Sequence, residues 1–159
     1  MLKLTTPQSK AALLIAAAIA IPFEGLREFA YYDPPGILTV CYGSTTNVVK
    51  NKKYSLDECK ARLTSDMTIA VQQVERCAPS APVPVLAAFA DAAYNIGPVV
   101  ACNPAKSFAA KHLAAGNYEA ACNELPKWNK ARIAGVLTPL PGLTKRREAE
   151  RQLCLSYRD

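Results

Sequence analysis

The sequence is poor in the residues that most metal and nucleophile sites need. Its 159 residues include one histidine, His112, and seven glycines that stand apart from one another. A Ser-His-Asp hydrolase would have to use His112 as its base, but the local sequence AAKHLAAG is typical of an ordinary amphipathic helix. Zinc ligation needs further histidines or closely paired cysteines, and isolated glycines make no phosphate-binding loop. We therefore expect neither a metal nor another cofactor.

A full-length membrane span is also lacking. The apolar run at residues 11–23, AALLIAAAIAIPF, is shorter than the about 20 residues that cross a bilayer. It follows Lys3 and Lys10, as the core of a signal peptide or a transient membrane anchor would. Because the run continues directly into FEGLREFAYYD, we favour a helix that is buried in the folded protein.

Charge of one sign prevails, at a formal net value of +6, with basic clusters at residues 50–53 and 145–151. A basic protein favours anionic partners such as nucleic acid, acidic lipid or an anionic cell wall. Charge alone selects none of them, and a solvated basic surface is the alternative interpretation.

Cysteine is the one reactive residue type that is plentiful. Six cysteines in a small domain without a metal motif indicate disulfides and an oxidising compartment, with buried free thiols as the alternative. The sequence leaves the pairing open. The simplest scheme joins neighbours in chain order: Cys41 with Cys59, Cys77 with Cys102, and Cys122 with Cys154.

Prolines and β-branched residues divide the first third of the chain. Pro22 should kink or end the helix that contains the apolar run. Residues 33–36, Asp-Pro-Pro-Gly, have the composition of a turn. Residues 37–42 have the composition of a strand, and Val48-Val49 could start its partner. We expect a small β-containing region at about residues 25–55.

The rest of the chain has helical patterns. Ser55 and Glu58 form a capping box, which begins a helix with an apolar stripe at about residues 56–78. Residues 79–159 carry further helices, and the one at 143–157 is amphipathic, with its basic residues predicted on the solvated face. The fold class is therefore α+β and mainly helical, in one domain where the helix at 7–23 packs on the helical C-terminal lobe.

Two carboxylates and a hydroxyl follow this first helix. Glu24 lies at its end, Asp33 at the turn, and Thr39 on the strand after it. Cleavage of a glycosidic bond uses one carboxylic acid to protonate the leaving oxygen and one carboxylate to activate water or attack the sugar. Apolar neighbours such as Phe23 and Leu26 would favour the protonated acid. By spacing alone the pattern is weak, and surface charges are the alternative.

The run FEGLREFAYYDPPGILTVCYGSTTNV resembles the phage-type lysozymes, glycoside hydrolase family 24. That family carries a glutamate, eight intervening residues, an aspartate, five intervening residues and a threonine, and Glu24, Asp33 and Thr39 match all three. AAYNIG at 92–97 and GLTKRREAERQLCL at 142–155 resemble later family segments. ACNELPKWN, which contains Cys122, resembles the cysteine-bearing endolysins, so the resemblance spans nearly the whole chain.

The resemblance implies a lysozyme-like fold and a muramidase that acts as a phage endolysin in host lysis, cleaving the β-1,4 bond between N-acetylmuramic acid and N-acetylglucosamine. Glu24 would be the general acid, Asp33 the base that activates water, and Thr39 a residue that places this water, with inversion at the sugar carbon. An arginine of the last helix is expected near the acid, with Arg146 the first choice and Arg147 the second. Tyr94 and Trp128 would line the sugar site or pack in the core.

The family also implies where the protein works and what it meets. We expect synthesis in the host cytoplasm, action in the periplasm on peptidoglycan glycan strands, and no nucleic acid partner. The first helix resembles that of the signal-anchor-release endolysins but lacks their longer separate anchor, so transient contact of residues 11–23 with the anionic inner membrane stays open. Ser44 stands where many members have histidine. We expect a monomer.

Two other classes of function remain in view. A basic cell-wall or nucleic-acid binding module would use the same basic clusters but would not need Glu24. A membrane-disrupting lytic protein would act through its basic C-terminal helix on anionic lipid.

Overall fold

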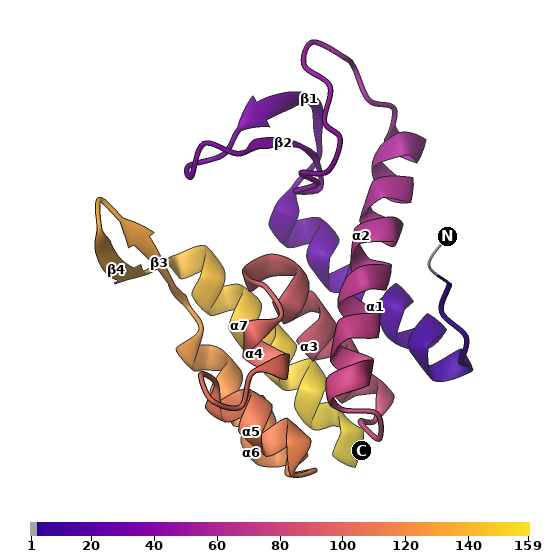
Figure 1. Ribbon diagram of the computed structural model, residues 1–159, viewed down its shortest axis with the longest axis vertical. Helices are drawn as coiled ribbons and strands as arrows, with labels where there is room; N and C mark the ends of the chain where they lie inside the picture. The colour runs from indigo at the N-terminus through magenta and orange to yellow at the C-terminus, as the bar shows by residue number, and fades with distance from the viewer. Residues whose placement is uncertain (1–2) are drawn as a thin grey trace.

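The computed structural model describes residues 3–159, and most of them are helical (Figure 1). The helices are α1 Pro7–Glu24, α2 Leu56–Cys77, α3 Val83–Ile96, α4 Val99–Cys102, α5 Phe108–Ala114, α6 Tyr118–Glu124 and α7 Pro141–Leu155, with short 3-10 turns at Leu125–Lys127 and Ser156–Arg158. The strands are β1 Arg27–Tyr32, β2 Leu38–Cys41, β3 Lys130–Ile133 and β4 Val136–Pro139. Figure 1 shows β1 and β2 at one end of the molecule, helices α3 to α7 at the other, and α2 running between them.

Glu24 lies in the last turn of helix α1. Thr6 caps the start of the helix by accepting a hydrogen bond from the backbone N–H of Ser9. Of the two outcomes predicted for Pro22, a kink or a helix end, the helix end is wrong, because α1 continues to Glu24 and closes with the N–H of Gly25 bonded to the carbonyl of Ile21. A proline this close to the C-terminus removes one backbone hydrogen bond, which leaves the last turn otherwise intact.

The face of α1 that meets the core is made of small side chains, Ala12, Ala16 and Ala20, which recur every four residues and are fully buried. This spacing places them on one side of the helix, so α1 can approach α3 closely. Leu14 points the other way and is 72% exposed. Among the helices of residues 3–159, none has the length and apolar character that a bilayer crossing requires.

The β-region is a hairpin, β1 against β2, with Tyr31 opposite Thr39. The strand predicted at residues 37–42 is present as β2, but its predicted partner Val48-Val49 is wrong, since those residues lie in a loop. The reason is the turn at residues 33–36, where Gly36 donates to the carbonyl of Asp33 and the chain folds back beside the strand before it.

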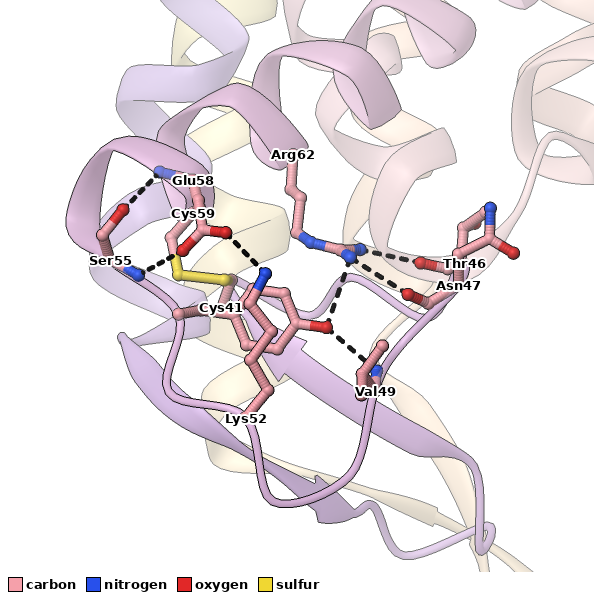
Figure 2. A network of polar contacts seen from close by, with 10 residues as sticks. Cys41, Thr46, Asn47, Val49, Lys52, Ser55, Glu58, Cys59 and Arg62 are labelled. Carbon is pink, nitrogen blue, oxygen red and sulfur yellow. Dashed lines mark hydrogen bonds and ion pairs between the residues drawn. A yellow bond between two sulfur atoms is a disulfide. The ribbon is translucent and has the colours of Figure 1, made fainter.

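Helix α2 begins with the predicted capping box, which is confirmed. The Ser55 hydroxyl accepts from the Glu58 N–H, and the Glu58 carboxylate accepts from the Ser55 N–H. From the next turns of α2, Arg62 donates to the carbonyls of Thr46 at 2.7 Å and Asn47 at 3.1 Å (Figure 2). These bonds hold the loop after β2 against the helix.

Three disulfides cross-link the elements of the fold, and they pair the cysteines in chain order, as the simplest scheme predicted. Cys41–Cys59 joins β2 to α2, as Figure 2 shows, Cys77–Cys102 joins the end of α2 to α4, and Cys122–Cys154 joins α6 to α7. No cysteine of the described chain is left free.

The C-terminal lobe surrounds α3, in which every residue from Val85 to Ala93 is buried. The expectation that residues 79–159 are helical throughout is wrong at 130–139, where β3 and β4 form a second hairpin. Its turn uses Ala134 and Gly135, both with positive φ. Glycine supports such a conformation readily, and this Ala-Gly pair between β-branched residues is the signal that the helical interpretation passed over.

Candidate active site

The Glu24 carboxyl lies where the end of α1 meets α7. Its Oε1 accepts a hydrogen bond from Nη1 of Arg146 at 2.5 Å. The Glu24 side chain is 19% exposed, whereas Arg146 is buried. The arginine sought near the acid therefore lies there as Arg146, and the carboxyl is held from the protein side while it remains open to solvent.

Phe23 and Leu26, the apolar neighbours expected beside Glu24, are 37% and 42% exposed. Phe23 lies beside the Arg146 guanidinium, whose centre is 5.7 Å from the ring centroid. The immediate neighbour of Glu24 is thus a cation.

Gly43 forms the third side of this site. Its φ is +83°, and a Cβ built on it would lie 2.9 Å from Oε2 of Glu24 and 3.7 Å from the hydroxyl of Tyr94. Tyr94, on α3, donates that hydroxyl to the carbonyl of Tyr42. Burial, followed by the charges of Glu24 and Asp66, raises the pKa of Tyr94 above its ordinary value, so the hydroxyl stays a neutral donor.

Asp33 and Thr39 form a second group at the turn end of the β1–β2 hairpin. Asp33 accepts a hydrogen bond from the N–H of Ile37 at 2.7 Å, and Thr39 donates its hydroxyl to the Ile37 carbonyl at 3.0 Å. Asp33 is partly exposed and Thr39 is buried. Within residues 3–159, no hydrogen bond joins Asp33 or Thr39 to Glu24.

A pocket of about 200 Å³ opens beside Gly43, between the loop after β2 and helices α2 and α3. Its lining combines apolar Ile69, Ala70 and Ala93 with groups that can form hydrogen bonds. The latter are Thr45, Thr46, Asp66, Gln73 and Tyr94. Burial raises the pKa of Asp66 above its ordinary value, against the opposing effects of the Ser44 hydroxyl and Arg62. Such a mixed lining suits a sugar, which offers hydroxyls and an apolar ring face.

Trp128 is partly buried, and its exposed part lines a second pocket of about 510 Å³ with Ile96 and Leu137. It therefore contributes both to the core and to a surface hollow near the β3–β4 hairpin.

Arg147, the second choice for the acid's partner, lies elsewhere. It is fully buried and donates Nη2 to Glu150 on its own helix. The prediction that the basic residues of 143–157 face solvent is thus wrong for both Arg146 and Arg147. Asp91 on α3 balances Arg146, and Glu150 on α7 itself pairs with Arg147; the pattern of α7 alone reveals neither contact.

Sequence reasoning missed Asp91, which binds Arg146 from α3. Its carboxylate accepts from Nε at 3.0 Å and from Nη2 at 2.7 Å, and it is fully buried. The signal was present, because an aspartate inside the apolar helix segment FADAAYNIG is rarely buried unless a cation pairs with it. Gly43 was missed as well, and only its contact with Glu24 reveals its importance.

Comparison with known proteins identifies the family of the chain. Residues 22–150 match the family model described as phage lysozyme. The chain belongs to the phage lysozyme family. The SAR-endolysin of Pseudomonas phage phiKMV is 33% identical over 154 residues, which cover 94% of this chain and 91% of the phage protein.

Solved structures share the fold. The endolysin from Escherichia coli O157:H7 phage FAHEc1 is 25% identical, with a TM-score of 0.79 over 98% of this chain and 97% of that one. The muramidase domain of SpmX from Asticaccaulis excentricus is 24% identical, with a TM-score of 0.77 over 95% and 99% of the two chains. The predicted family, the α+β fold class and the enzyme class are confirmed: the protein is a lysozyme-type endolysin that hydrolyses peptidoglycan.

Replacement of Gly43 by alanine should lower cell-wall hydrolysis, because the new methyl group collides with the Glu24 carboxyl and the backbone is strained at φ +83°. A displaced carboxyl costs about 100-fold in rate when it shifts by about 1 Å. Gly116→Ala is the matched control, since Gly116 has a φ of +72° and nothing within 4 Å of an added Cβ. Comparable rates for the two variants on purified walls, measured at equal folded fraction, would contradict the contact with Glu24.

Proposed function

We propose that this endolysin is a muramidase in which Glu24 is the general acid and Asp33 the base. The supporting observation is the accessible Glu24 carboxyl, held by Arg146 beside the pocket lined by Gly43 and Tyr94. A glycan strand that enters this pocket would pass its glycosidic oxygen in front of Glu24. The bond to be cut is the β-1,4 linkage between N-acetylmuramic acid and N-acetylglucosamine.

The chemistry needs one proton donor and one proton acceptor. Glu24 donates its proton to the leaving glycosidic oxygen while a water molecule attacks the sugar carbon, so that one C–O bond breaks and another forms. The water's proton passes to Asp33, and transfer back to Glu24 through solvent restores the starting state. Once Glu24 has given up its proton, the charged hydrogen bond from Arg146 stabilises its carboxylate.

Asp33 and Thr39 suit the placement of this water. The hydrogen bond from the Ile37 N–H fixes the direction of the Asp33 carboxylate, and the Thr39 hydroxyl is anchored to the same residue. A single displacement by water inverts the configuration at the sugar carbon. Inversion is thus the expected stereochemistry, and proton NMR of the first anomer released distinguishes it from retention.

The route to the wall belongs to this proposal. The protein is made in the host cytoplasm and acts in the periplasm as a monomer. The exposed Leu14 and Ile21 give α1 an apolar outer edge, at 72% and 40% exposure, which supports a transient contact of residues 11–23 with the inner membrane. The net charge of +6 favours the anionic membrane surface and the anionic wall alike.

Mass spectrometry of digested peptidoglycan tests the bond that is cut. We expect disaccharide muropeptides with a reducing muramic acid end, because water is the attacking group. Anhydro-muropeptides would show a transglycosylase and free stem peptides an amidase, and either result would overturn the proposal. An absence of any product, combined with salt-sensitive DNA binding, would instead favour the binding-module alternative.

A further inference from the structure

Asp91 is a buried charge that the proposed chemistry does not use. It lies on α3 among alanines and a phenylalanine, and it is fully buried. Burial of an unpaired carboxylate is costly, so such a residue needs a specific partner. Its partner is Arg146, which donates a hydrogen bond to each of the two carboxylate oxygens.

The geometry of this pair fixes a third bond. Asp91 holds Nε and Nη2 of the guanidinium at 3.0 Å and 2.7 Å, and the remaining nitrogen, Nη1, is the one that donates to Glu24. A guanidinium is planar and rigid, so two fixed nitrogens determine the direction of the third. Asp91 therefore sets where Arg146 meets Glu24, although it lies on a different helix.

The charges around this chain of contacts come from four helices. Glu24 approaches from α1, Asp66 from α2, Asp91 and Tyr94 from α3, and Arg146, Arg147 and Glu150 from α7. Burial, and then the hydrogen bond with Asp91, raise the pKa of Glu150 well above its ordinary value. Glu150 pairs with Arg147 on its own helix, whereas Asp91 forms the two-point contact with Arg146.

We propose that Asp91 is a positioning residue for the muramidase reaction: through Arg146 it holds the Glu24 carboxyl in the direction from which it protonates the glycosidic oxygen. The inference rests on the proposed function of Glu24. It assigns to α3 a part in the chemistry that neither the spacing of the carboxylates nor the pocket reveals.

The substitution Asp91→Asn tests this role, because it keeps the shape and removes the charge. We expect kcat on purified peptidoglycan to fall by about 10- to 100-fold with little change in KM, since the substrate contacts are untouched. The basic limb of the pH profile should move to lower pH. Arg146 then faces Glu24 without its counter-charge, so Glu24 loses its proton more readily.

Glu150→Gln is the matched control. It is the same acid-to-amide change in the same buried cluster, but Glu150 pairs with Arg147 and does not hold the two guanidinium nitrogens that direct Arg146 toward Glu24. We expect its pH profile to stay that of the wild type. A purely structural role for the cluster would lower the melting temperature of both variants and shift neither profile.

A double substitution keeps the test decisive if Asp91→Asn folds poorly. Removing both charges of a buried pair destabilises the fold less than removing one, so the double variant Asp91→Asn/Arg146→Gln should fold. Because Asp91 acts through Arg146, adding Asp91→Asn to Arg146→Gln should leave kcat unchanged. A further fall in kcat there, or a folded Asp91→Asn enzyme with the wild-type kcat and pH profile, overturns the inference.

The wild-type digest separates this outcome from failure of the proposed function. If the wild-type protein releases no reducing muropeptides, the muramidase assignment itself is wrong. If it releases them and Asp91→Asn does so at the same rate and pH, only the role of Asp91 is wrong.

Discussion

Replacing Glu24 by glutamine should abolish the clearing of purified cell walls while the fold stays intact. The amide cannot supply the proton that the leaving oxygen requires, and a positioned general acid contributes on the order of 10³-fold in rate. Glutamine has the size of glutamate, and its carbonyl can still accept the hydrogen bond from Arg146 that the carboxylate receives at 2.5 Å. The loss should therefore appear in kcat, with a melting temperature near that of the wild type.

The matched control is Glu28→Gln, the same chemical change four positions along the chain. Glu28 lies on β1 and pairs loosely with Lys53, at 3.7 Å and with both side chains well exposed. An exposed pair of this kind contributes little, so both clearing and stability should be unchanged. Clearing by Glu24→Gln at the wild-type rate would remove the assignment of the acid. Killing of whole cells that survives Glu24→Gln, without wall hydrolysis, would favour the membrane-disrupting alternative.

The sequence predicts the part of the site that is local in the chain. Glu24, Asp33 and Thr39 fall within one short segment, where a helix end, a turn and a strand follow one another, so their spacing together with the family resemblance indicates the motif. The partners of Glu24 come from far away, since Arg146 lies 122 positions later and Asp91 meets Arg146 across 55 positions. No local pattern reports such contacts. The family resemblance suggested Arg146, whereas the apolar segment around Asp91 indicates a buried charge without identifying its partner.

The fold shows the same division between local and distant information. The capping box of Ser55 and Glu58 places the start of α2 correctly, because capping depends on residues within one turn. The predicted partner of β2 was wrong: β2 pairs with β1, and the sequence of a short strand does not determine which neighbouring strand it pairs with. The hairpin at 130–139 was missed for a related reason: four-residue strands are too short for an alternation of apolar and polar residues to stand out.

Removing the disulfide between Cys122 and Cys154 should have the largest effect on stability of any change away from the active site. The two residues are 32 positions apart, the longest span among the three disulfides. Opening a loop of this length costs about 3–4 kcal/mol in the chain-entropy model, because the unfolded chain regains that freedom. For a chain of this size that corresponds to a fall in melting temperature of about 10 °C. Activity at room temperature should persist, since Cys154 lies about 12 Å along α7 from Arg146.

The variant for this test carries alanine at both positions, because both sulfurs are fully buried and serine would bury unpaired hydroxyls. Calorimetry under oxidising conditions should show the lower melting temperature. A reductant that opens all three disulfides provides the matched control, since the wild type and the variant then differ only by two buried thiols and should melt close together. Equal melting temperatures under oxidising conditions, or free thiols in a titration of the oxidised wild type, would contradict the disulfide. The expected loss ties stability to the oxidising compartment, so the protein should be weakest where it is made and strongest where it meets the wall.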